Sequence, residues 1–132
     1  MCQQGAIAVI ITNNPMVHEA YAGADGLRYE ADFSFLDALI LARDQIHLGR
    51  ALLTHPLAGG VRPGRTPYKT ILLSKKPEGL HAQSLALIEQ CIHRAQRLTQ
   101  ETAVAPPGGR IDRDLQFIDF CLTQDCIDEY LR

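Results

Sequence analysis

The stretch AIAVIITNNP, residues 6 to 15, predicts the centre of the fold. Its first seven residues form an unbroken apolar run rich in β-branched side chains, which is typical of a strand covered on both faces. Asn14 is a favourable N-cap and Pro15 suits the first position of a helix, so we expect a short helix over about residues 15 to 22. The strand therefore ends at the N-terminus of a helix.

Beyond this helix, apolar patterns continue to alternate between strands and helices. Ser34 followed by Asp37 predicts a capped helix, which Gly49 closes. The linker APPGG, residues 105 to 109, separates off a C-terminal helical segment over residues 110 to 132, within which LQFIDFCL, residues 115 to 122, could instead be a strand. The other expected elements are strands at residues 27 to 33, 50 to 54 and 68 to 74, and a helix at about residues 80 to 103.

This alternation predicts an α/β protein, with residues 1 to 132 forming a single domain. We expect three layers: an open, mostly parallel sheet of about four strands in the order 2-1-3-4, with helices on both faces. The first strand would then lie between the second and the third. The fourth strand could run antiparallel, because the connection that leads to it contains no predicted helix.

Composition excludes several classes of protein. With 13 basic and 15 acidic side chains the net charge is -2, which gives no general attraction to nucleic acid or to an anionic membrane. The N-terminal apolar run is too short to span a membrane and lacks the features of a signal peptide, so we expect a cytoplasmic protein. The cysteines and histidines do not have metal-ligand spacing, and we expect neither a metal nor a cofactor.

The loop THPLAGGVRPGRTP, residues 54 to 67, contains an incomplete phosphate-loop pattern. Gly59, Gly64 and Thr66 stand at positions of this pattern, but Arg65 occupies the position at which the pattern has lysine. Pro67 and a strand-like segment follow, whereas a phosphate loop opens a helix. These departures argue against a nucleoside triphosphatase.

A looser anion site remains. Ligands of open α/β sheets bind beyond the carboxyl ends of the strands, where the turn TNNP and the arginine loop should meet. Arginine binds carboxylate or phosphate through two parallel N–H bonds, and glycine lets the backbone approach a ligand. The alternative is that glycine and proline merely shape a connection whose arginines are solvated. The predicted ligand-binding residues are Thr12, Asn13, Asn14, Thr54, Gly59, Gly60, Arg62, Arg65 and Lys69.

Two other functional hypotheses are open. His55 follows a strand end and is a candidate general base for a transferase or hydrolase, with Thr12 or Asn13 beside it, although a structural or solvated histidine is the alternative. The C-terminal helix could instead dock on a partner protein or on a second copy of the chain, forming a homodimer. Whether the protein is an enzyme is therefore open.

Three blocks of sequence resemble the GrdX family, small proteins encoded with the glycine, sarcosine and betaine reductase systems of anaerobic bacteria. The blocks are IITNNPMV, ARDQIHLG and LLTHPLAGGVRPGRTPYKTILL, within residues 7 to 74. The resemblance implies a cytoplasmic accessory to amino-acid reduction, with reductase-system proteins as partners, and it supplies no reaction or catalytic residues. The chain has no Cys-x-x-Cys pair of the kind a reductase component would use.

Overall fold

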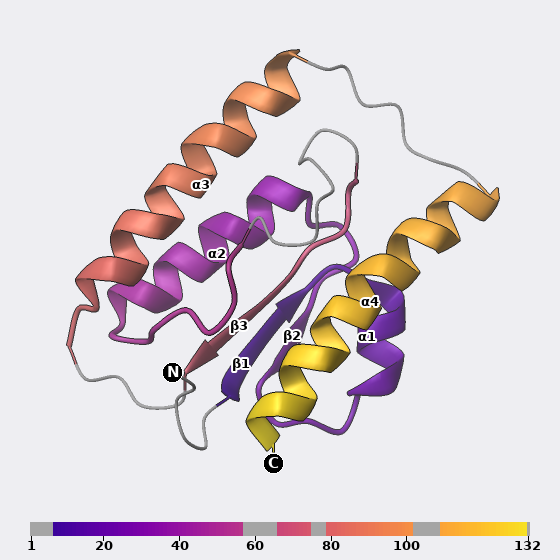
Figure 1. Ribbon diagram of the computed structural model, residues 1–132, viewed down its shortest axis with the longest axis horizontal. Coiled ribbons are helices and arrows are strands. Elements are labelled where there is room, and N and C mark those ends of the chain that lie inside the picture. Colours follow the sequence, from indigo (N-terminus) through magenta and orange to yellow (C-terminus); the bar gives the residue numbers. More distant parts are fainter. Residues whose placement is uncertain (1–6, 57–65, 75–78, 102–108, 132) are drawn as a thin grey trace.

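The computed structural model of the protein describes residues 7–56, 66–74, 79–101 and 109–131 (Figure 1). Strands and helices alternate through the first half, and two long helices complete the chain. The elements in order are β1 (Ile7–Thr12), α1 (Pro15–Ala20), β2 (Leu27–Tyr29), α2 (Phe35–His47), β3 (Thr70–Ser74), α3 (Ala82–Glu101) and α4 (Gly109–Leu131).

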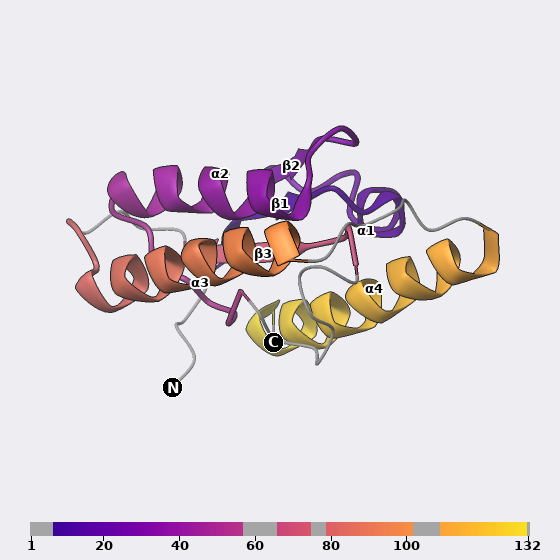
Figure 2. The ribbon, with the colours of Figure 1, turned by 90° about the horizontal axis from the view of Figure 1, so that it is seen from above.

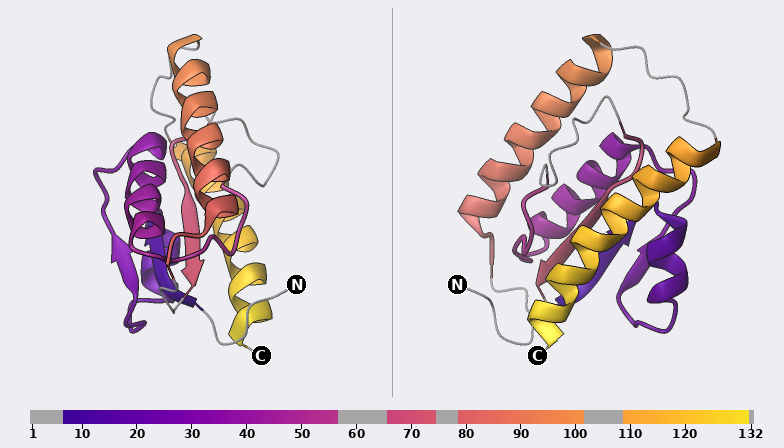
Figure 3. Two further views of the ribbon diagram at one scale, coloured as in Figure 1. Left: turned by 90° about the vertical axis from the view of Figure 1, so that its left-hand side faces the viewer. Right: turned by 45° about the vertical axis from the view of Figure 1, so that its right-hand side comes forward.

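The sheet has the strand order β2-β1-β3. β1 runs parallel to β2 and antiparallel to β3, with Ile11 opposite both Arg28 and Ile71. Figure 2 shows α2 and α4 on opposite sides of β3, and in the right-hand view of Figure 3 α4 crosses in front of the sheet. The protein therefore has three layers, with helices on both faces of a mixed sheet.

Successive residues of β1 and β3 belong in alternation to two hydrophobic cores, one on each face of the sheet. Ile11, Ile71 and Leu73 pack with α2 and α3 in the larger core. Ile10 and Leu72 point to the opposite face, where Val17 of α1 and Ile127 of α4 complete the smaller core. Side chains alternate between the faces of a strand, so two buried faces require the continuous apolar runs found in both strands.

The local signals at the start and end of α2 act as predicted. The Ser34 hydroxyl accepts a hydrogen bond from the Asp37 backbone N–H at 3.1 Å, and the Asp37 carboxylate accepts one from the Ser34 N–H at 3.0 Å. This reciprocal pair confirms the capping box. Gly49 follows the helix with a φ of 105°, a conformation that glycine adopts without strain.

The predicted sheet was wrong in the number and order of its strands and in being mostly parallel, although the alternative of an antiparallel last strand is correct. The described residues contain three strands rather than about four, and the sheet is mixed rather than mostly parallel. β1 does not lie between β2 and the segment at residues 50 to 54. Its second neighbour is β3, the strand expected to come fourth.

Burial explains why β3, and not the segment at residues 50 to 54, takes the position next to β1. Ile71, Leu72 and Leu73 are all buried, so this strand needs a covering layer on each face. Residues 51 to 54 are only partly buried and lie along the outer edge of β3, where the Leu53 N–H donates to the Leu72 carbonyl and the Ser74 N–H to the Ala51 carbonyl, each at 2.9 Å. The predicted third strand is thus an edge segment with one isolated bridge, between Leu52 and Leu73.

The C-terminal segment is the helix α4, so the alternative strand at residues 115 to 122 is wrong. α4 packs against α1 and against the face of the sheet formed by β1 and β3. None of the helices within the described ranges is both long enough and apolar enough to cross a membrane.

Candidate functional site

The turn after β1 meets the residues that lead into β3 at one end of the sheet. The Asn13 side-chain amide donates to the Pro67 carbonyl at 2.7 Å and to the Phe33 carbonyl at 2.8 Å, while its oxygen accepts from the Lys69 backbone N–H at 2.9 Å. Asn13 is 4% exposed. Its side chain therefore fastens three separate parts of the backbone together.

The carboxylate of Asp119, in α4, lies beside this junction. Thr70 donates its hydroxyl proton to Asp119 Oδ2 at 2.7 Å, and Asn14 Nδ2 donates to the same oxygen at 2.9 Å. The Thr12 and Thr70 hydroxyls are 2.8 Å apart. Since the Thr70 proton is used by Asp119, Thr12 donates to Thr70, which makes a chain of hydrogen bonds from β1 through β3 to α4.

Asn14 links the same carboxylate to α1. Its side-chain oxygen caps the helix by accepting from the Met16 N–H at 3.0 Å, and its amide also donates to the Gln116 carbonyl at 2.9 Å. Asp119 therefore supplies an internal negative charge next to the first turn of α1, where the sequence predicted an external anion. Thr12, Asn13 and Asn14 are buried and hydrogen-bonded within the protein, and their contact with a ligand stays a prediction.

The Lys69 side chain lies on the face of the sheet opposite to Asp119. It is 7% exposed, and its Nζ lies 5.7 Å from the centre of the Phe35 ring. Burial lowers the pKa of Lys69, and the charge of Asp119 opposes this effect without coming within ion-pair distance. The one ion pair among the described residues joins Arg43 and Glu89 on the surface, so Lys69 is a buried cation without a paired carboxylate in this part of the chain.

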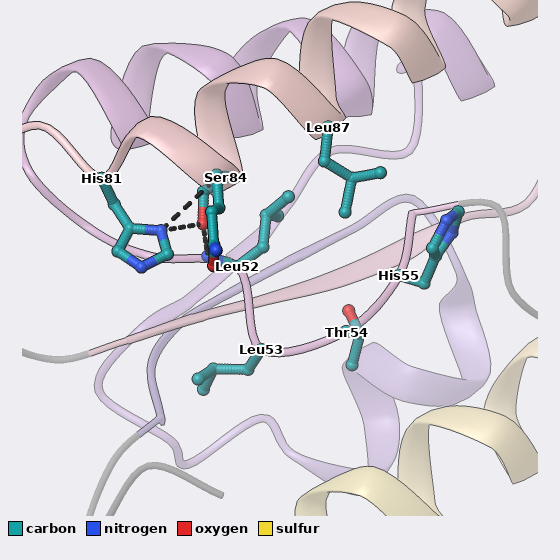
Figure 4. A pocket seen from close by; sticks show the side chains of 8 residues that line it. Leu52, Leu53, Thr54, His55, His81, Ser84 and Leu87 are labelled. Carbon is teal, nitrogen blue, oxygen red and sulfur yellow. Dashed lines mark hydrogen bonds between the residues drawn. The ribbon is translucent and has the colours of Figure 1, made fainter. Parts of the chain in front are cut away.

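Thr54 and His55 line a groove of about 280 Å³ between the edge segment and the first turns of α3 (Figure 4). His81 and Ser84 lie on the α3 side of this groove. His81 Nδ1 accepts from the Ser84 backbone N–H at 3.2 Å, so the Ser84 hydroxyl, 2.8 Å away, donates to the same nitrogen. The Ser84 oxygen in turn accepts from the Leu52 N–H at 2.9 Å. The pair thus caps α3 and fastens the edge segment to it.

The predicted site residues fall into separate groups. Thr12, Asn13 and Asn14 belong to the hydrogen-bonded junction with α4, Thr54 and His55 to the groove, and Lys69 to the face toward α2 and α3. Gly59, Gly60, Arg62 and Arg65 lie outside the described residues. Asp119 had not been predicted at all, although it connects three elements.

Tyr68 provides a pH-dependent contact between the start of β3 and α4. Its hydroxyl donates to Asp112 Oδ1 at 2.6 Å and accepts from Gln116 Nε2 at 3.0 Å. Burial and the Asp112 carboxylate raise the pKa of Tyr68 to about 12. The folded state therefore keeps the phenol proton at a pH where the unfolded chain, with a tyrosine pKa of about 10, releases it.

We expect Tyr68→Phe to lower the free energy of unfolding by about 1 kcal/mol at neutral pH, because the variant loses this hydrogen bond. The stabilisation is fully present below pH 10 and declines as the pH rises toward 12, so the difference between parent and variant should shrink over that window. Urea unfolding at pH 8, 10 and 11 measures both effects. A difference that stays constant over this range would contradict the assignment.

Together these features define a small α/β protein in which a C-terminal helix is joined by Asp119 to the end of a mixed sheet. A family model described as GrdX-like protein matches residues 9–128, and the chain belongs to this family. The resemblance found in the sequence is thereby confirmed, and the match extends through α3 and most of α4. The family name fits an association with glycine reductase-type systems. The comparisons with curated proteins and with solved structures found no match.

Proposed function

We propose that this GrdX-like protein is an accessory protein of glycine, sarcosine or betaine reductase metabolism that binds a small carboxylate or phosphate compound. The proposed site is the end of the sheet where β1 ends and β3 begins. The observation that carries the proposal is Lys69, a lysine 7% exposed with no carboxylate at ion-pair distance among the described residues.

The energetics of Lys69 favour an anionic ligand. Burying an ammonium group without a paired anion is unfavourable, and the lowered pKa expresses this cost. An anion beside Nζ would offset the lost hydration and hold the lysine in its charged form. Arg62 and Arg65 precede Lys69 in the chain, and we propose that they add two-pronged contacts to the same ligand.

Lys69→Met tests the site because methionine keeps the long apolar stem and removes the charge. We expect the parent to gain thermal stability from at least one of glycine, sarcosine, betaine, acetate or inorganic phosphate, and the variant to lose this response. Without ligand, Lys69→Met should be more stable than the parent by about 1 kcal/mol, since a desolvated charge has been replaced by an apolar group. Differential scanning fluorimetry and urea unfolding measure these two quantities.

Arg43→Met serves as the matched control, because Arg43 is a surface cation on α2 that is paired with Glu89. This variant should respond to the same compound as the parent does. A response to the ligand that is equal in Lys69→Met and the parent would contradict the proposed site. A strongly destabilised Lys69→Met protein would instead show that the ammonium group supports the fold.

The second candidate is a transferase or hydrolase reaction at His55. The observation that favours it is the groove, which places His55 and Thr54 on one wall beside a space of about 280 Å³. A panel of phosphorylated and amino-acid compounds would reveal turnover, which His55→Ala should abolish while leaving the unfolding transition unchanged. Turnover retained in His55→Ala would rule out this residue as the general base.

A further inference from the structure

Lys69 combines an enclosed stem with an amine that has no partner in the described part of the chain. The side chain as a whole is 7% exposed, and its Nζ lies over the Phe35 ring. Each buried side-chain nitrogen or oxygen atom of the described residues has a hydrogen-bond partner, whereas no hydrogen bond or ion pair among these residues holds Nζ. Nζ is therefore not one of the enclosed atoms, and it lies where the side chain reaches the surface.

The backbone around Lys69 holds this amine in one place. The Lys69 N–H donates to Asn13 Oδ1 at 2.9 Å, and the Lys69 carbonyl accepts from the Asn13 N–H at 3.4 Å. The next residue, Thr70, is bonded to Asp119 on the opposite face of the sheet. A nucleophile that is already held in position reacts faster than one on a flexible chain, because it loses less freedom on reaction.

The surroundings of Lys69 favour the uncharged amine more than water does. Burial lowers the pKa of Lys69, and the charge of Asp119 only partly opposes this effect. The uncharged amine has the lone pair that attacks a carbonyl carbon, and desolvation is one of the ways in which proteins activate such lysines. The enclosed stem and the accessible nitrogen therefore give Lys69 the character of a nucleophile.

We propose that Lys69 forms an imine with a small carboxylic acid that carries an aldehyde or ketone group next to its carboxylate. This inference rests on the anion site proposed above, which supplies the contacts for the carboxylate. Nζ attacks the carbonyl carbon to form a C–N bond, and the carbinolamine that results loses water as the C=N bond forms. The carbonyl oxygen leaves in that water with the two hydrogens of the amine, so the step needs neither an oxidant nor a reductant.

The charge of the adduct favours a carbonyl compound that also has a carboxylate. A protonated imine carries a positive charge into a place where Lys69 has no paired anion among the described residues. The carboxylate of the same compound lies next to this charge and offsets the cost of burying it. The face of the Phe35 ring, 5.7 Å from Nζ in the free protein, adds a further favourable contact for a cation.

Reductive trapping tests this chemistry, with glyoxylate and pyruvate as probes. Cyanoborohydride reduces an imine to a stable secondary amine, so mass spectrometry of the full chain should show one adduct. Peptide mapping should place it at Lys69 and not at the other two lysines, Lys75 and Lys76. Labelling of Lys69 should be roughly tenfold or more faster than that of Nα-acetyl-lysine in the same solution. An unlabelled Lys69, or a rate equal to that of the model compound, would overturn the proposal.

Substitution of the lysines assigns the adduct. The variant Lys75→Arg with Lys76→Arg is the matched control, and it should be labelled as fast as the parent. Lys69→Arg keeps a cation at the site but has no amine to form an imine, so the adduct should disappear. If Lys69→Arg fails to fold, Lys69→Met replaces it. An undiminished adduct in a folded Lys69 variant would show that another amine reacts, against the proposal.

Acetate separates the imine from the anion site on which it rests. Acetate has the carboxylate without an aldehyde or ketone group, so it should slow the trapping of glyoxylate and form no adduct itself. Thermal stabilisation by acetate in a protein that glyoxylate never labels would overturn the imine and leave the anion site standing. Labelling of Lys69 that acetate does not slow, in a protein that no anion stabilises, would overturn the anion site and with it the requirement for a carboxylate.

Discussion

Asp119→Ala is expected to lower the free energy of unfolding by about 3 kcal/mol, since two buried donors lose a charged acceptor together. Thr70 and Asn14 both donate to Asp119 Oδ2, and they are 6% and 0% exposed. Alanine leaves both buried groups without this partner, although the Asn14 amide keeps its bond to the Gln116 carbonyl. It also removes the side-chain hydrogen bond between α4 and β3, so their contact then depends on the Ile127 and Leu72 core and on Tyr68.

Urea unfolding followed by circular dichroism measures this loss, with Asp114→Ala as the matched control. Asp114 lies on the same helix but is exposed, so its replacement should change the free energy of unfolding by no more than about 0.5 kcal/mol. Asp119→Asn keeps an acceptor of the same shape and should cost only about 1 kcal/mol, the difference between a charged and a neutral hydrogen bond. Equal stability of the Asp119→Ala and Asp114→Ala proteins would contradict the role of this carboxylate.

The elements that the sequence predicted well are those specified by nearby residues. The apolar run before Thr12 requires two covering layers, and the reciprocal bonds of Ser34 and Asp37 involve residues three positions apart. Asn14 likewise caps α1 through its own neighbours. In each case the physical cause and its effect lie within one turn of chain, where a pattern can be read without coordinates.

Strand order depends on contacts between distant residues, and there the prediction failed. Chain order suggested that the segment at residues 50 to 54 would pair with β1, whereas complete burial of Ile71, Leu72 and Leu73 gives that place to β3. The helix-free connection correctly suggested an antiparallel strand as an alternative, but strand direction alone does not determine which neighbour the strand joins.

Asp119 shows why the site was harder to predict than the fold. Its bond to Asn14 spans 105 positions, and within LQFIDFCL it is a lone acidic residue. The usable signal was the spacing of Asp112, Gln116, Asp119 and Thr123 along α4. The apolar residues around Asp119 also made a strand a reasonable alternative for residues 115 to 122.

Asn13→Ala should reduce the free energy of unfolding by a similar amount, about 3 kcal/mol, through a different mechanism. The Asn13 amide bonds the carbonyls of Phe33 and Pro67, and its oxygen bonds the Lys69 N–H. These groups belong to two backbone segments, one at Phe33 and one at Pro67 to Lys69, and the side chain joins both to the turn after β1. Alanine removes one partner from each of these groups, so the entry to α2 and the start of β3 both loosen.

Hydrogen exchange and a second substitution distinguish the loss of the Asn13 hydrogen bonds from a simple loss of packing. The Lys69 amide should exchange faster in Asn13→Ala than in the parent, because it has lost the acceptor at 2.9 Å. Asn13→Asp keeps that acceptor but replaces both donors with a carboxylate facing two carbonyl oxygens, so we expect it to be at least as unstable as the alanine variant. Gln124→Ala removes an exposed amide on α4 and should be neutral. If Asn13→Asp is as stable as the parent, the two donated hydrogen bonds contribute nothing to the junction, and the retained bond from the Lys69 N–H is enough to hold the turn after β1 in place.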